Sequence, residues 1–197
     1  MKQEERRFQT RNRLLEATKA LIHEKGCHSI TMKDIMEKSQ LSKGAIFHYV
    51  KSKDEIFALV LQERLEETNQ RFMAEVEVNE KTFAGPMHKI MLSLSSLEAS
   101  NEVTNMVLVY LLGKENEPAV AEVLQRFYER SVQLSRTWIV TGQQHGVIPQ
   151  SVNADKTAEM FVLISIGMRV RSSFPAISAS FTSADFSDLI VNQLQPE

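Results

Sequence analysis

The chain has 197 residues, a formal net charge of −2 and one cysteine, Cys27. A single cysteine excludes an intrachain disulfide and a zinc site built from cysteine pairs, and it fits a reducing compartment. No apolar run reaches the roughly 20 residues that span a bilayer, and the charged N-terminus lacks the apolar core of a signal peptide. We therefore expect a cytoplasmic protein.

Charge is distributed unevenly along the chain. Residues 1–53 hold 12 Lys and Arg against 6 Asp and Glu, whereas the remaining residues hold 11 against 19. A basic segment on an acidic body is the layout of a protein that meets nucleic acid at one end. A basic run can also be a plain solvated surface, but here the basic excess coincides with the motif described next.

Three capping signals divide the basic segment into short helices. A first helix is expected from a cap at Thr10 to about Lys25, ended by Gly26. Thr31-Met32-Lys33-Asp34 has the form of a capping box and starts a second helix. Ser39-Gln40-Leu41 interrupts it, and Ser42 can cap a third helix that runs from Lys43 to Val50.

Two short helices joined by a tight turn form a helix-turn-helix, whose second helix enters the DNA major groove. On spacing alone, three core helices of an ordinary helical domain remain equally open.

Further signals predict only helices in the rest of the chain, with no persuasive strand. The box Ser52-Lys53-Asp54-Glu55 opens a helix to about Val78, and Gly85-Pro86 marks the start of the next. Later helices are expected at Val103 to Leu112, from Pro118 to His145-Gly146, from Asn153 to about Ser173, and from the box Thr182-Ser183-Ala184-Asp185 onward.

Residues 31–57 resemble the N-terminal signature of the TetR family of transcriptional regulators. The matching positions are Thr31, Ile35, Leu41-Ser42-Lys43-Gly44, Ile46, Phe47-His48-Tyr49, Lys53 and Ile56-Phe57. The resemblance implies an all-α chain of about nine helices. It would have a helix-turn-helix DNA-binding domain over residues 1–53, and a helical effector-binding and dimerisation domain over residues 54–197.

Among the positions that depart from the family pattern, two bear on the turn and on DNA contact, and the others are Met36, Ser39 and Val50. Gln40 stands where the turn usually has Gly, and a left-handed conformation there would cost roughly 1–2 kcal/mol. Phe47 stands where a Tyr hydroxyl often meets a phosphate.

The expected DNA contacts lie on the third helix and at neighbouring helix N-termini. Lys43 can bond guanine and the Ala45 methyl can meet a thymine methyl. Thr31, Lys33 and Lys53 stand at helix N-termini, where free N–H groups attract phosphate. The complete set is Thr31, Lys33, Ser42, Lys43, Gly44, Ala45, Phe47, His48, Tyr49 and Lys53.

The stretch from Met160 to Met168 is apolar nearly all round, which is typical of a helix buried on every face. We expect it to pack with the last helix against a second chain, although the central helix of a monomeric core is the alternative. The expected homodimer interface comprises Phe161, Ile164, Gly167, Met168, Phe186, Leu189 and Ile190. Two recognition helices roughly 34–36 Å apart would then read a pseudo-palindromic operator.

Methionine and aromatic side chains provide material for a pocket that would accept a small apolar or amphipathic effector. At helical spacing the same residues can also be plain core. The expected lining is Met87, Met91, Met106, Tyr110, Phe127, Trp138 and Phe161. Arg169 follows the apolar run and can meet an acidic ligand, a salt-bridge partner or solvent.

The sequence thus predicts a repressor that a small molecule releases from its operator. One alternative is a regulator that binds no ligand and acts through a protein partner. The other is a helical lipid- or drug-processing enzyme. The enzyme is disfavoured because the chain has no phosphate-binding glycine loop, no nucleophile elbow and no helical histidine pair. No metal and no cofactor is expected.

Overall fold

The chain is helical throughout the part described by the computed structural model, residues 2–78, 82–174 and 176–195. No strand occurs in these ranges, as the sequence predicted. The elements in chain order are α1 (Lys2–Ser29), α2 (Met32–Ser39), α3 (Lys43–Phe47), α4 (Lys53–Val78), α5 (Ala84–Leu94), the 3₁₀ helix η1 (Ser95–Glu98), α6 (Val103–Leu112), α7 (Pro118–Gln144), α8 (Ala154–Arg171) and α9 (Ser183–Leu194).

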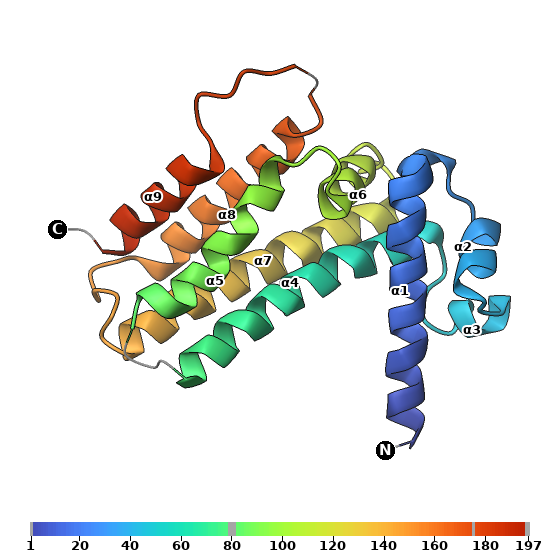
Figure 1. Cartoon of the computed structure of the whole chain (residues 1–197), viewed down its shortest axis with the longest axis horizontal. Helices are drawn as coiled ribbons and strands as arrows, with labels where there is room; N and C mark the ends of the chain where they lie inside the picture. The colour runs from blue at the N-terminus through green and yellow to red at the C-terminus, as the bar shows by residue number, and fades with distance from the viewer. Residues whose placement is uncertain (1, 79–81, 175, 196–197) are drawn as a thin grey trace.

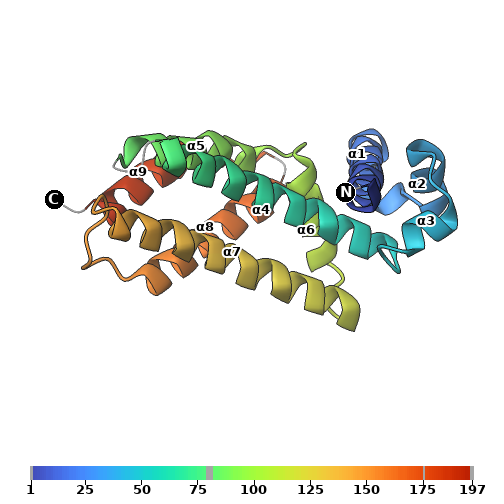
Figure 2. The same cartoon turned by 90° about the horizontal axis from the view of Figure 1, so that it is seen from below.

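The helices form a small head and a larger body. Figure 1 shows α1, α2 and α3 together at one end, while α5, α7, α8 and α9 extend toward the other. The long helix α4 runs from the head into the body beside α7, and α6 lies between α8 and α1 (Figure 2). The body therefore contacts the head through α4 and α6.

The predicted caps hold the helix starts. Thr31 Oγ1 accepts from the Asp34 amide at 3.2 Å while Asp34 Oδ2 accepts from the Thr31 amide at 2.8 Å. The same reciprocal pair forms between Thr182 and Asp185 at the start of α9. Asn153 caps α8 in the simpler way, through one bond from the Lys156 amide. Side-chain acceptors at these positions satisfy amides that have no partner within the helix.

Three helix boundaries differ from the prediction. The first helix begins at Lys2 rather than after Thr10, because the Thr10 hydroxyl donates to the Arg6 carbonyl inside the helix at 2.8 Å. Gly26 does interrupt α1, with φ 70° and ψ 160°, but helical turns resume as far as Ser29. The third helix ends at Phe47, three residues before the expected Val50.

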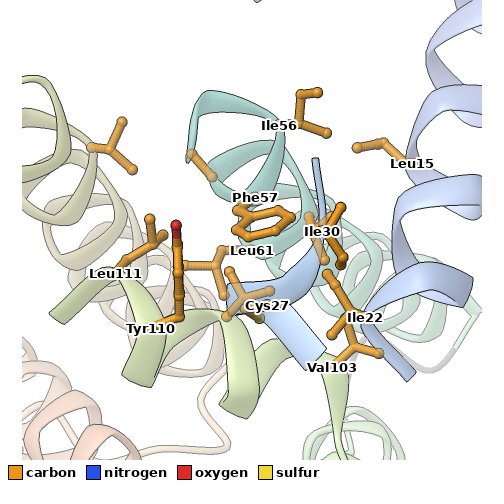
Figure 3. Packing of buried hydrophobic residues seen from close by; sticks show 14 of the residues in the cluster. Leu15, Ile22, Cys27, Ile30, Ile56, Phe57, Leu61, Val103, Tyr110 and Leu111 are labelled. Atoms are coloured by element: carbon orange, nitrogen blue, oxygen red, sulfur yellow. The ribbon is translucent and has the colours of Figure 1, made fainter. Parts of the chain in front are cut away.

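Two apolar clusters stabilise the chain, and α4 contributes to both. The first joins the head to the near end of the body, where Phe57 of α4 packs among side chains of α1 and α6 (Figure 3). The second lies in the body and includes Phe72 and Val76 of α4. The boundary predicted between residues 53 and 54 therefore falls at the start of a helix that packs on both sides of it.

Candidate DNA-binding surface and effector cavity

The turn between α2 and α3 is fixed by local hydrogen bonds and by the small core beneath it. Gln40 adopts the left-handed conformation, with φ 54° and ψ 33°, as the departure from the usual Gly suggested. Arg13 Nη2 donates to the Ser39 carbonyl at 3.0 Å and so satisfies the end of α2. Ser42 Oγ accepts from the Ala45 amide, and the buried side chains of Ile35 and Ile46 hold the two helices together.

The outer face of α3 presents a group of exposed side chains. Lys43 lies with its Nζ 5.5 Å from the centre of the Phe47 ring, and no carboxylate pairs with it among the described residues. Lys33 is also exposed, with only a distant Glu37 oxygen at 3.8 Å. Six predicted contact residues of α2, α3 and its caps are exposed, namely Lys33, Ser42, Lys43, Gly44, Phe47 and His48.

Three further residues predicted to contact DNA are hydrogen-bonded or partly buried within the protein. The Thr31 hydroxyl serves the capping box with Asp34. The Tyr49 hydroxyl, expected on a phosphate, donates to the Arg7 carbonyl at 3.4 Å and rests on α1. Ala45 is half-buried. These residues shape the edge of the surface, and the Thr31 and Tyr49 hydroxyls would have to leave their present partners to bind DNA.

Lys53, which the sequence placed at the DNA surface, is engaged by hydrogen bonds within the chain, so its DNA contact stays a prediction. Lys53 Nζ donates to the Ile30 and Cys27 carbonyls at 2.9 and 3.1 Å, and it lies 5.2 Å from the centre of the Tyr110 ring. Burial lowers the pKa of this ammonium. The reason lies in the end of α1, where carbonyls left without helical partners attract the nearest cation. Lys53 therefore joins the head to the body.

Two adjacent cavities lie within the body. The smaller, about 80 Å³, is lined almost entirely by apolar side chains of α5, α7, α8 and α9. The larger, about 110 Å³, lies between α4, α5, α7 and α8, and it carries the guanidinium groups of Arg64 and Arg169 and several Ser and Thr hydroxyls. Trp138, Ile90 and Leu94 line both. Together the two cavities have an apolar end and a polar, cationic end.

The predicted pocket residues are divided among different places. Met87, Trp138 and Phe161 line the smaller cavity, and Phe127 and Trp138 line the larger. Met106 and Tyr110 instead face a separate surface hollow beside the end of α1. Met91 packs against the body cluster and lines neither cavity.

For Met91, Met106 and Tyr110 the structure shows packing outside the two body cavities, and Met and aromatic residues serve plain packing as readily as binding. Tyr110, for example, packs edge to face on Phe57 and His28, with ring centres 5.3 and 4.9 Å away. The prediction also lacked Ser135 and Ser165, which line both cavities. Nothing in the sequence around these two serines indicates a place in a binding cavity.

The predicted dimer residues separate into a buried and an accessible set. Phe161, Met168, Phe186 and Ile190 are buried inside the single chain, because α8 and α9 pack on α5, α7 and η1. These four residues therefore lie beneath the surface of the single chain, and their contact with a second chain stays a prediction. Gly167 is exposed, and Ile164 and Leu189 are half-buried. Their neighbour Leu163, which the prediction omitted, is 56% exposed.

The fold and the exposed α3 define a helix-turn-helix DNA-binding protein with a helical body. Residues 14–60 match the family model described as bacterial regulatory proteins, tetR family. The transcriptional regulator UidR of Escherichia coli is 26% identical over 159 residues, which cover 81% of this chain and 79% of UidR.

Solved structures show the same fold. A TetR-family regulator from Syntrophomonas wolfei aligns with a TM-score of 0.69 at 18% identity, over 96% of this chain and 97% of that one. A transcriptional regulator from Saccharomonospora viridis, solved in complex with choline, aligns with a TM-score of 0.59 at 22% identity, over 92% and 95% of the two chains.

The head of the chain therefore matches the TetR-family DNA-binding domain, and the whole chain is similar to TetR-family transcriptional regulators that bind DNA. Its relatives are regulators and not enzymes, which removes the lipid- or drug-processing alternative. None of the described helices combines the length and the hydropathy needed to cross a bilayer.

Proposed function

We propose that this regulator is a homodimeric repressor that binds a pseudo-palindromic operator through α3 and leaves it when a small molecule occupies the body cavities. Such a repressor would act in the cytoplasm, where its DNA lies. The observation that carries the proposal is the pairing of an exposed α3 with a body cavity lined by Arg169, whose side chain donates to α6, the helix packed on the head.

The surface of α3 is suited to the major groove. Lys43 is exposed and free of carboxylate partners among the described residues, so its ammonium can reach guanine acceptors. Gly44 has open space around the position that a Cβ would take, which lets the helix approach base edges closely. Lys33 would bind a flanking phosphate and position the head.

Dimerisation would use the outer faces of α8 and α9. Leu163 exposes an apolar side chain, and nothing lies within 4 Å of a Cβ built on Gly167, so another backbone could approach there. Two chains related by a two-fold axis would bury these positions in an isologous contact.

Leu163→Glu should leave the chain folded but monomeric. Leu92→Glu is the matched control, because Leu92 of α5 is 63% exposed and lies outside this face. Analytical ultracentrifugation decides, and a Leu163→Glu protein that stays dimeric contradicts the proposed interface.

The cavity connects to the head through α6. Arg169 Nη1 at the cavity donates to Thr104 Oγ1 and Asn105 Oδ1 in the first turn of α6, at 2.8 and 2.7 Å. At the other end of α6, Tyr110 contacts His28 and Lys53. A ligand that shifts α6 would move the head, and effector and operator would then weaken each other's binding by the same factor. The choline held by the Saccharomonospora viridis protein supports a small organic effector in this fold.

Selection of bound genomic fragments tests the proposal. We expect two-fold symmetric sites, and a fall in affinity of about tenfold or more for Lys43→Ala together with relaxed base preference. Lys156→Ala, an exposed lysine on α8, serves as control. Fragments without symmetry would contradict the dimeric operator. Affinity that no metabolite extract from the host lowers would favour the regulator that acts through a protein partner.

A further inference from the structure

Arg169 is a half-buried cation of the body with part of its hydrogen-bonding capacity unused. Both of its hydrogen bonds come from Nη1, and its Nε and Nη2 donate to no described residue. Burial lowers the pKa of the guanidinium to about 10, so it stays charged at neutral pH. Among the described residues, Asp54 Oδ1 is the one fully buried side-chain polar atom that has no hydrogen-bond partner. Nε and Nη2 of Arg169 also have no partner, so they must be accessible to solvent, and Arg169 lines the larger cavity.

The positive charge at this cavity is only partly compensated. No ion pair joins Arg169 to a carboxylate within the described ranges, and Glu102, which acts on Arg169 only through its charge, accepts from the Thr104 hydroxyl at 3.3 Å. Arg64 lines the same cavity, and its one ion pair is a loose 3.8 Å contact with Glu67. The lining contains these two arginines and no Asp or Glu. A buried charge without a partner is unfavourable, and a ligand anion would relieve it.

We infer that the effector is an organic carboxylate with an apolar body, its carboxylate held by Arg169 in the larger cavity and its apolar part beside Trp138. The inference rests on the proposed ligand-released repressor and specifies the chemistry of its ligand. A guanidinium presents paired donors that match the two oxygens of a carboxylate. The smaller, apolar cavity adjoins the larger one, and Trp138 lines both.

The same arginine gives the ligand a route to α6. A carboxylate bound to the free Nε and Nη2 of Arg169 would shift the guanidinium whose Nη1 donates to Thr104 and Asn105. Asn105 is otherwise fixed, because its Nδ2 donates to the Ser96, Leu97 and Ala99 carbonyls. Loss or weakening of the bond from Arg169 would therefore release the first turn of α6 from α8. Arg169 both reads the ligand and positions α6.

The experiment uses Trp138, the single tryptophan of the chain and a wall of both cavities, as an internal reporter. Its fluorescence is followed while the dimer is titrated with three probes of the same body and different charge. They are 3-phenylpropanoate, its neutral amide and the cationic 3-phenylpropylamine. We expect the carboxylate to bind about tenfold more tightly than the amide and the amine more weakly still.

Variants of Arg169 test whether this side chain causes the preference for carboxylate over amide. Arg169→Gln should reduce the preference for carboxylate over amide to near unity, Arg169→Lys should retain part of it, and Arg71→Gln, an exposed arginine of α4, should leave it unchanged. If Arg169→Gln unfolds, the charge series on the natural chain decides alone. Equal binding of the three probes, or none, overturns the inference.

A parallel titration of operator affinity separates the two proposals. Carboxylate that binds without loosening the operator supports the anion site and contradicts the ligand-released repressor. Operator release by the amide or amine as readily as by the carboxylate supports the repressor and overturns the anion site.

Discussion

Lys53→Met asks whether the Lys53 ammonium stabilises the chain rather than binding DNA. Methionine keeps an unbranched stem beside Phe57 and Tyr110 but removes the hydrogen bonds to the Cys27 and Ile30 carbonyls. Hydrogen bonds from charged groups contribute about 1.5–3 kcal/mol each, and partial exposure of Lys53 reduces this, so we expect a loss of about 2 kcal/mol in unfolding free energy. For a chain of 197 residues that corresponds to a melting temperature lower by about 4–8 °C.

Two measurements on the same protein test this reasoning. Circular dichroism gives the melting temperature at fixed protein concentration, and fluorescence anisotropy gives the salt dependence of operator binding. Each lost phosphate contact would flatten the logarithmic salt slope by about 0.9. We expect no change of slope for Lys53→Met, and neither effect for Lys51→Met, an exposed lysine two residues away. A variant that melts like the natural chain but shows a flatter slope would refute the internal role.

Three further predictions concern the head. Gln40→Gly should raise the melting temperature by about 2–4 °C over Gln40→Ala, because glycine relieves roughly 1 kcal/mol of left-handed strain; equal melting would contradict the strain. Cys27 is buried and its thiol pKa is raised to about 11, so iodoacetamide near pH 8 should modify the folded chain roughly 100-fold more slowly than the chain in urea, as mass spectrometry would report. Hydrogen bonds from Lys25 and Thr31 hold the pKa of Asp34 far below its usual range. That carboxylate therefore stabilises the fold above about pH 4 and ceases to do so as the pH falls through the folded value, so the deficit in melting temperature of Asp34→Asn should shrink in acid.

The helix starts could be predicted from the sequence because their signals are local. Thr31, Ser42, Asn153 and Thr182 each accept from an amide three residues later, and such a bond depends on little outside the turn that contains it. The start of α1 was missed because a local signal can have two meanings. A threonine inside a helix can donate to a carbonyl four residues earlier, as Thr10 does, and the sequence does not distinguish this from a cap.

The partners of side chains on different helices could not be predicted. Lys53 finds acceptors 23 and 26 residues away, and Arg169 finds its partners 64 and 65 residues away. A cation at a helix start looks the same in sequence whether it faces phosphate or a carbonyl. Likewise, the apolar stretch of α8 indicated burial but not which neighbours bury it. Phe161 and Met168, which were assigned to contact with a second chain, are buried within their own chain.

The continuity of α4 has a mechanical consequence. Its 26 residues, at about 1.5 Å each, make a rod roughly 39 Å long that is anchored in both apolar clusters. A tilt of about 5° at the far end would displace the near end by about 3 Å, close to the rise of one base pair. Because α4 is a continuous helix, no flexible linker separates the DNA-binding head from the body. A functional chimera of two regulators would need its junction within α4, and it would have to keep the residues that pack on α4 in both apolar clusters.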